Sequence, residues 1–215
     1  MDVREFYGKV WEEYADPVHH PITAGCLRKQ RELVRARIND RKPRSILDLG
    51  CGPRPVLRPD QAPLVVSADL IREMLSLIAD RYGCRPVCLD ARCLPFRARS
   101  FDFIWCGLLV DHIRDVEQWI ADLVRVLRPG GTLGLAGWDR SGVPPDRYPG
   151  GSCMRYTRST GEELVVDSYA NWEETLRVLR RRARVEVEFH AIDAGYTLLA
   201  AFARPQTSAK VKGKG

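Results

Sequence analysis

The stretch Ser45-Ile46-Leu47-Asp48-Leu49-Gly50-Cys51-Gly52-Pro53-Arg54-Pro55 decides the fold. Its first half is a short apolar run typical of a buried strand, and Gly50-Cys51-Gly52 is a turn in which the backbone can approach a ligand closely. A nucleotide-binding turn of this kind continues with a third glycine and a helix. Here Arg54 stands where the third glycine is expected, and prolines follow it. The stretch therefore predicts a strand that ends at a ligand site of altered form.

The regions around this strand alternate between short apolar runs and amphipathic segments. We expect strands at 45–49, 64–68, 86–89, 101–106 and 132–138, and helices at 2–14, 23–40, 71–80, 114–127 and 171–182. This alternation indicates an α/β fold with a parallel sheet covered on both faces. Residues 184–192 and 196–202 are expected to form an antiparallel pair at the sheet edge.

The bulk composition is that of a globular protein. The chain has 215 residues, 45% of them hydrophobic, with a net charge of +6 and a pI near 9.0. No run of about 18 apolar residues is present, so no membrane span is expected. Seven cysteines, an odd number, suit reduced thiols, and the N-terminus does not resemble a signal peptide, so we expect a cytoplasmic protein. The basic residues fall in separate runs typical of solvated helix faces, so nucleic acid is not expected as a partner.

Three aspartates follow successive predicted strands. Asp48 lies near the end of the first strand, Asp69 follows the second and Asp90 follows the third. In an open α/β sheet the ligand crevice lies outside these strand ends, and Asp69 has the spacing of an acidic residue that binds ribose hydroxyls. Each aspartate taken alone could also be a turn residue or a helix cap.

Four segments carry a resemblance to a known family: ILDLGCG, VVSADLIREML, LDARCLPFRARSFDFIWC and LVRVLRPGGTLGLAGWD. The chain resembles class I S-adenosylmethionine-dependent methyltransferases of the small-molecule type, such as those of ubiquinone and natural-product biosynthesis. The similarity runs from about Ser45 to Trp138 and more faintly to Pro205. It implies a Rossmann-like, seven-stranded, mostly parallel sheet with helices on both faces, one antiparallel strand and an N-terminal helical cap.

The resemblance also implies a division of the chain. Residues 1–205 would form a single methyltransferase domain, and residues 206–215 a disordered basic tail. Within the domain we expect a helical cap at 1–43, a cofactor-binding core at 44–138, a substrate-side insertion at 139–170 containing a hairpin, and a closing helix and hairpin at 171–205. Because the insertion contains several aromatic residues, it is expected to line the substrate pocket together with the N-terminal cap, through some of Tyr148, Met154, Tyr156 and Tyr169.

Matching positions imply a cofactor site for S-adenosylmethionine. Its residues would be Tyr14, Asp48, Gly50, Cys51, Gly52, Arg54, Asp69, Leu70, Met74, Asp90, Ala91, Cys106 and Gly107. The glycine turn would lie against the methionine part and Asp69 would hold the ribose. Leu70 and Met74 would border the adenosine, and Asp90 with Ala91 would meet the adenine amino edge.

The remaining positions of this site concern the methionine end. Cys106 and Gly107 would lie beneath the sulfonium. Tyr14, on the cap, would touch the cofactor carboxylate or else belong to an aromatic core with Trp11. Arg54 would either supply the positive charge that a missing helix does not, or point to solvent while the cap meets the carboxylate.

The segment Leu109-Val110-Asp111-His112-Ile113 holds the candidate catalytic residues. In relatives this position often carries two histidines or a histidine and an aspartate, one of which serves as a base. Asp111 or His112 would therefore face the substrate; alternatively both cap the helix expected to begin near Arg114.

No metal site is expected. Cys84, Cys88 and Cys93 have no nearby fourth ligand and are interpreted as core thiols. The leading hypothesis is methyl transfer to a small molecule by direct displacement at the sulfonium methyl. The alternatives are an RNA or protein methyltransferase, or a non-enzymatic member of the fold. The sequence leaves the acceptor atom and the oligomeric state open.

Overall fold

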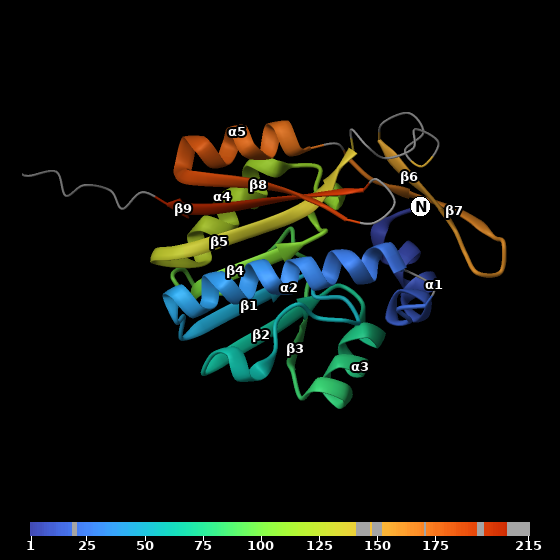
Figure 1. The fold of residues 1–215 in the computed structure, drawn as a ribbon, viewed down its shortest axis with the longest axis horizontal. Helices are drawn as coiled ribbons and strands as arrows, with labels where there is room; N and C mark the ends of the chain where they lie inside the picture. The colour runs from blue at the N-terminus through green and yellow to red at the C-terminus, as the bar shows by residue number, and fades with distance from the viewer. Residues whose placement is uncertain (19–20, 141–146, 148–151, 170, 193–195, 206–215) are drawn as a thin grey trace, which may run out of the picture.

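The computed structural model describes residues 1–18, 21–140, 147, 152–169, 171–192 and 196–205. Seven strands form one sheet in the order β3-β2-β1-β4-β5-β9-β8 (Figure 1). They are β1 (Ser45–Leu49), β2 (Leu64–Asp69), β3 (Arg85–Cys88), β4 (Phe101–Gly107), β5 (Leu127–Asp139), β8 (Ala183–Ala191) and β9 (Thr197–Pro205). Only β9 runs against its neighbours, because it pairs antiparallel with both β5 and β8. The predicted seven-stranded sheet with one antiparallel strand is confirmed.

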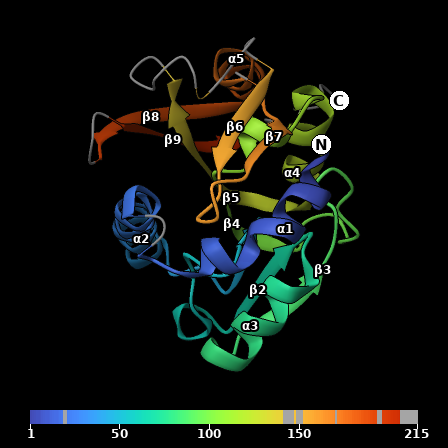
Figure 2. The same cartoon turned by 90° about the vertical axis from the view of Figure 1, so that its right-hand side faces the viewer.

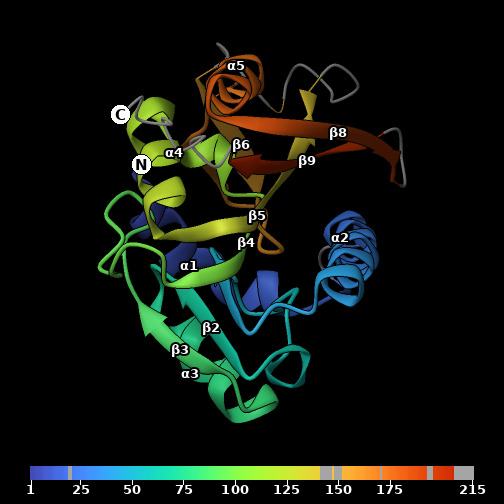
Figure 3. The same ribbon diagram turned by 90° about the vertical axis from the view of Figure 1, so that its left-hand side faces the viewer.

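Helices cover both faces of this sheet. They are α2 (Pro21–Arg41) on one face, α4 (Val116–Val126) and α5 (Trp172–Arg182) on the other, and α3 (Arg72–Tyr82) against β2 and β3 (Figure 3). Successive side chains of β1 point to opposite faces, as a strand requires. Ile46 packs in the cluster with α2, whereas Leu47 and Leu49 pack in the cluster with α4 and α5. The apolar run of β1 is thus explained by burial on both sides.

Helix α4 begins later than expected. The side chain of Asp115 accepts a hydrogen bond from the Gln118 N–H at 3.0 Å, which makes Asp115 the N-cap. The interpretation that Asp111 and His112 cap this helix is therefore wrong. Both residues lie instead in a short 3-10 turn, η2 (Val110–His112), between β4 and α4.

The proline-rich segment after β1 contains no α-helix. Between β1 and β2 the chain forms only the 3-10 turn η1 (Pro59–Gln61), as the prolines predicted. Val56 and Leu57 are buried and pack in the cluster with α2. The Leu57 N–H donates to Oδ2 of the buried Asp48 at 3.1 Å. Apolar burial and this hydrogen bond hold the segment in place where a helix is missing.

The N-terminal helix and the inserted hairpin lie together over one end of the sheet (Figures 1 and 2). They are α1 (Val3–Ala15), β6 (Cys153–Thr157) and β7 (Glu163–Asp167), the last two forming a separate antiparallel sheet. Phe6 and Val10 of α1 pack against Met154 and Val166 of the hairpin. The predicted hairpin is confirmed, and its apolar face is covered by α1.

Polar contacts fix α1 to the hairpin as well. The buried carboxylate of Glu13 accepts from the Tyr156 hydroxyl at 2.7 Å and from Arg158 Nε at 2.9 Å. The N-terminal ammonium of Met1 donates to the Val165 carbonyl at 2.9 Å. Burial raises the pKa of Glu13, but the hydrogen bonds from Tyr156 and Arg158 outweigh burial and leave that pKa lowered. Glu13 is therefore ionised where it joins the two elements.

In the described part of the chain no helix is both long enough and apolar enough to cross a membrane. The tail at 206–215, for which disorder was expected, lies outside the described residues.

Candidate active site

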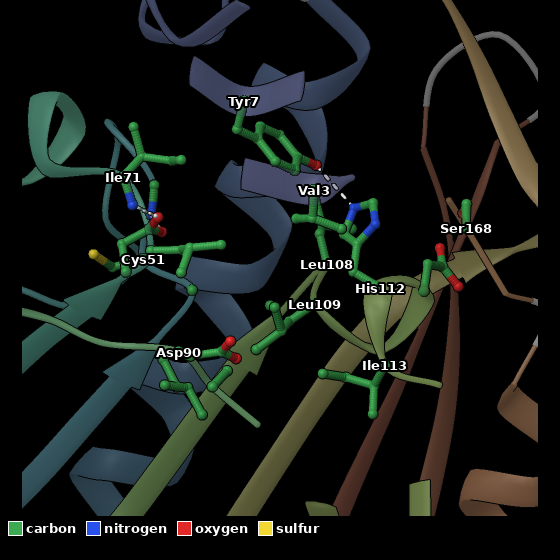
Figure 4. A pocket seen from close by; sticks show the side chains of 18 of the residues that line it. Val3, Tyr7, Cys51, Ile71, Asp90, Leu108, Leu109, His112, Ile113 and Ser168 are labelled. Atoms are coloured by element: carbon green, nitrogen blue, oxygen red, sulfur yellow. Dashed lines mark hydrogen bonds between the residues drawn. The ribbon is translucent and has the colours of Figure 1, made fainter. Parts of the chain in front are cut away.

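A cavity of about 770 Å³ opens at the carboxyl ends of β1, β2 and β4, beneath α1 and the hairpin. Its wall includes the glycine turn and Asp69 on one side, and Asp111 and His112 on another. Figure 4 shows these two sides facing one another, with Asp90 and Ile71 opposite His112 and Ser168. The topology thus brings together segments that are far apart in the sequence.

The glycine turn is tied to the end of the next strand. The N–H groups of Gly50 and Cys51 both donate to the Ala68 carbonyl, at 2.8 and 3.1 Å. Gly50 and Gly52 have φ values of +70° and +59°, a region that favours glycine. A Cβ on Gly52 would meet nothing within 4 Å, so the turn leaves open space at this point. Cys51 also lines the cavity, and its side chain packs with Leu75 and Cys84.

Asp69 holds the same turn from β2. Its Oδ2 accepts from the Gly52 N–H at 2.9 Å and its Oδ1 accepts from the Ile71 N–H at 3.1 Å. Burial raises the pKa of Asp69, although these backbone hydrogen bonds oppose the rise. Both oxygens keep further lone pairs, so the carboxylate can also accept from a ligand in the cavity.

Asp48 lines the cavity floor but is almost completely buried. Burial raises its pKa to about 7, and the nearby charge of Asp69 adds to this rise. Since its carboxylate accepts from Leu57, the first role of Asp48 is to order the segment after the turn.

The far end of the cavity has an apolar wall. Its lining includes Leu70, Ile71, Met74, Leu89, Ala91 and Trp119. Asp90 lies at this end and forms a two-point pair with Arg92, with Nε–Oδ1 and Nη2–Oδ2 distances of 2.9 and 2.6 Å. The hydrogen bond from Arg92 lowers the pKa of Asp90. Trp119 was missed by the sequence interpretation because its position on α4 indicated only a core residue.

The end of β4 places only one of its two expected residues at the cavity. Gly107 lines it, whereas the side chain of Cys106 is completely buried in the core and does not. A Cβ on Gly107 would lie 2.1 Å from Oε1 of Gln30, which accepts from Trp105 Nε1 at 3.2 Å. Gln30, a buried residue of α2 that also lines the cavity, was not predicted.

Tyr7 and His112 form a hydrogen-bonded pair across the cavity (Figure 4). Nδ1 of His112 lies 3.1 Å from the Asp167 carbonyl, which can only accept, so Nδ1 carries the proton. In the neutral imidazole Nε2 is then the acceptor, and the Tyr7 hydroxyl donates to it at 2.9 Å. Burial lowers the pKa of His112 and raises the pKa of Tyr7 well above its ordinary value. Both groups are therefore neutral near pH 7.

Asp111 is buried beside this pair and faces Arg140. Its Oδ1 lies 3.6 Å from Arg140 Nη2, and burial raises its pKa to about 6 although Arg140 opposes the rise. Arg140 also donates to Ser168 Oγ at 2.7 Å and to the Tyr169 carbonyl at 2.9 Å. The hairpin is thus attached to the segment after β4 through Arg140.

Of the expected aromatic residues, Tyr14 and Tyr169 line the cavity, as does Met154. The Tyr14 ring packs edge-on against Tyr7, with ring centroids 5.3 Å apart. Tyr156 is not part of the cavity wall, because its hydroxyl is turned to Glu13. Tyr148 lies outside the described residues.

Two further expectations are corrected. Arg54 lines the cavity and its Nε and Nη2 are buried, so these two atoms do not point to solvent, contrary to one of the two alternatives. Cys84 is buried, but Cys88 and Cys93 are exposed and are not core thiols. The described residues hold no cluster of potential metal ligands.

This fold, with its crevice at the carboxyl ends of parallel strands, is Rossmann-like. Residues 47–135 match a family model described as a methyltransferase domain. The chain is 30% identical over 152 residues to malonyl-[acyl-carrier protein] O-methyltransferase of Pseudescherichia vulneris, a match that covers 67% of this chain and 60% of that protein. The chain spans about half the length of the curated relatives it matches.

Solved structures share the fold at lower identity. The PH0226 protein of Pyrococcus horikoshii OT3 has a TM-score of 0.66 and 18% identity, covering 91% of this chain and 98% of that one. The 1,6-didemethyltoxoflavin-N1-methyltransferase of Burkholderia thailandensis, solved with S-adenosylhomocysteine, has a TM-score of 0.63 and 18% identity, covering 95% and 88%. Residues 47–135 are thus a methyltransferase domain, and the matched relatives and the shared fold agree with the resemblance to class I S-adenosylmethionine-dependent methyltransferases drawn from the sequence.

Proposed function

We propose that the protein transfers a methyl group from S-adenosylmethionine to a small-molecule acceptor. The observation that carries this proposal is a single cavity that joins the glycine turn and Asp69 to the Tyr7–His112 pair. Its volume of about 770 Å³ lies in the range of small-molecule and cofactor pockets.

The residues at the turn fit the cofactor. Gly52 leaves open space beside the backbone, and the Asp69 carboxylate is held at the cavity wall by two backbone N–H groups. Asp69 would accept from the ribose hydroxyls, with Leu70 and Met74 along the adenosine. Asp90 and Ala91 would meet the adenine edge, with Asp90 oriented by Arg92. S-adenosylmethionine, when bound, supplies a methyl group on a positively charged sulfur.

The chain contributes mainly positioning and the exclusion of water, which is most of what methyl transfer needs. Tyr7 and Tyr14 cover the cavity from α1, and Met154 and Tyr169 cover it from the inserted segment. Because α1 and the hairpin share a buried apolar cluster, they close the site as one unit. We propose that this unit, with residues 139–170 supplying one wall, shapes the acceptor pocket.

The Tyr7–His112 pair offers a place for the acceptor's proton. Neutral His112 has its Nδ1 proton held by the Asp167 carbonyl, so its Nε2 is free to gain a proton by way of the Tyr7 hydroxyl. An acceptor that hydrogen-bonds to the Tyr7 oxygen would lose its proton to Tyr7 as Tyr7 passes its own to His112. This arrangement suits hydroxyl or amine acceptors, which start protonated.

Asp111 would orient the acceptor beside this pair. With a pKa of about 6 its carboxylate is mostly ionised at pH 7, and Arg140 keeps it in place. The charge of Asp167 favours the imidazolium that forms when His112 gains a proton, whereas the charge of Arg140 opposes it.

Of the named relatives, one is an O-methyltransferase of malonyl-[acyl-carrier protein], whose acyl group is attached to a carrier protein, and another is solved with the small molecule 1,6-didemethyltoxoflavin; the second supports a small acceptor. The test is incubation with methyl-labelled S-adenosylmethionine and three separate pools: a small-metabolite extract, total RNA and total protein. We expect label in the metabolite pool. Label confined to the RNA or protein pool would contradict the proposal, and label in none would favour a non-enzymatic member of the fold.

A further inference from the structure

The carboxylate at the methionine end of the cofactor needs a positively charged or hydrogen-bonding partner. This chain lacks one common partner, a helix N-terminus just after the glycine turn. A helix that begins just after the glycine turn can offer free N–H groups and a partial positive charge. Between β1 and β2 the structure has only the short turn η1, so no helix N-terminus points at the cavity from this segment. Another positive group must take that place if the carboxylate is to be neutralised there.

Arg54 is in the right place to do so. It lies two residues beyond Gly52, and both Arg54 and Gly52 line the cavity. Nε and Nη2 of Arg54 are buried and donate to no partner within the described part of the chain. Buried donors without a partner are costly to a fold, so Nε and Nη2 of Arg54 indicate an anionic ligand that completes the site.

Two neighbouring arginines, Arg31 and Arg58, add positive charge near Arg54 and so favour the binding of an anion there. Arg31 of α2 donates through Nη2 to the Pro55 carbonyl at 3.2 Å and has a buried, unpartnered Nε. Arg58 stacks on the Tyr82 ring with Cζ 3.8 Å from the ring centroid. Burial and then the charge of Arg31 lower the pKa of Arg54, and burial and then the charge of Arg58 lower the pKa of Arg31. Tyr82 and then the carboxylates of Asp16, for Arg54, and Asp48, for Arg31, oppose this lowering only in part.

None of these arginines has a carboxylate within 4.0 Å among the described residues, although many other arginines of the chain do. The cluster of Arg31, Arg54 and Arg58 is therefore a concentration of positive charge that lacks a counter-ion, and only Arg54 of the three reaches the cavity.

We infer that Arg54 binds the carboxylate of S-adenosylmethionine and so replaces the helix N-terminus that this chain has lost. The guanidinium fork matches a carboxylate with two parallel hydrogen bonds, and Arg54 would turn its buried, unpartnered Nε and Nη2 toward the cavity to form them. Arg31 acts behind it, by holding the Pro55 carbonyl and raising the local positive potential. This inference rests on the proposed function and adds the group that recognises the methionine end.

The test compares three ligands by isothermal titration calorimetry: S-adenosylhomocysteine, its decarboxylated analogue, which keeps the amine, and 5′-methylthioadenosine, which lacks both groups. In the Arg54→Ala variant we expect the affinity for S-adenosylhomocysteine to fall about tenfold or more, as the loss of a charge-assisted hydrogen bond implies. The affinities for the other two ligands should change less than about twofold on the same reasoning. Arg54→Lys keeps the charge but not the guanidinium fork, so its affinity for S-adenosylhomocysteine should lie between those of the unmodified protein and Arg54→Ala.

Arg147→Ala is the matched control, because Arg147 also lines the cavity and also has a buried Nε without a partner in the described chain. We expect it to leave the preference for the carboxylate unchanged. The inference would be overturned if Arg54→Ala weakened the binding of all three ligands equally, or weakened none of them. It would also be overturned if Arg147→Ala, instead of Arg54→Ala, selectively weakened the binding of S-adenosylhomocysteine. Failure of the unmodified protein to bind S-adenosylhomocysteine would refute the proposed function itself, and circular dichroism of each variant confirms that it is folded.

Discussion

Replacement of Asp69 by alanine should damage the cofactor site in two separable ways. The carboxylate accepts from the Gly52 N–H at 2.9 Å and from the Ile71 N–H at 3.1 Å, so it holds the glycine turn and the start of α3 together. Under the proposed function it also accepts from the ribose hydroxyls. Hydrogen bonds to a charged group contribute about 1.5–3 kcal/mol each. Loss of even one ribose contact therefore predicts a tenfold to hundredfold weaker binding of S-adenosylhomocysteine.

The assay is calorimetric titration with S-adenosylhomocysteine and 5′-methylthioadenosine. Both ligands contain the ribose, so Asp69→Ala should weaken both by the same factor, unlike Arg54→Ala. Chemical denaturation of the same variant should show a loss of about 1–3 kcal/mol, because two partly buried N–H groups lose their acceptor. Asp69→Asn keeps an oxygen for one of these N–H groups and should retain more stability than alanine. Unchanged titrations in Asp69→Ala would remove Asp69 from the cofactor site.

Three further predictions follow from the pair at the cavity, the buried floor and the cover. Tyr7→Phe should slow methyl transfer to a hydroxyl or amine acceptor by about a hundredfold while leaving the affinity for S-adenosylhomocysteine within about threefold; an unchanged rate would refute the proton role of the Tyr7–His112 pair. Asp48 has a folded pKa of about 7, above its ordinary value, so the unfolded chain releases this proton first and stability should fall as pH rises from about 4 to 7. Urea denaturation at several pH values should show that slope in the native protein and a flatter one in Asp48→Asn; equal slopes would contradict it. Glu13→Ala should increase hydrogen exchange in α1 and the β6–β7 hairpin and cost about 1–3 kcal/mol, because the Tyr156 hydroxyl loses its buried acceptor; unaltered exchange would show that Glu13 does not hold the cover.

Local signals in the sequence were sufficient for the side of the cavity formed by the glycine turn and Asp69. The alternation of apolar strands and helices predicted the sheet, and the prolines after Gly52 predicted the missing helix between β1 and β2. Asp69 and the glycine turn were found because their spacing follows from one strand–turn–strand unit. These features depend on residues close together in the chain, where turn chemistry and hydrophobic periodicity act directly.

The opposite side of the cavity could be predicted only in part: Asp111 and His112 were expected there, but their partner Tyr7 was not. Tyr7 and His112 are 105 positions apart, and they meet only because α1 is placed over the strand ends. Gln30 is a polar residue in a helix of many charges, and nothing local indicates that it is buried against Trp105. Cys106 was predicted at the site because its position matched the family, but the alternation of side chains along the strand places its thiol in the core. Such contacts are set by tertiary packing, which a single sequence does not display.

Under the proposed function the cavity of this protein, despite its altered turn, is a functional site for S-adenosylmethionine. The most direct measurement is a calorimetric titration of the unmodified protein with S-adenosylhomocysteine. We predict saturable binding of one ligand per chain, accompanied by a rise in the unfolding temperature that grows with ligand concentration. Absence of both heat and thermal stabilisation at saturating ligand would contradict the claim.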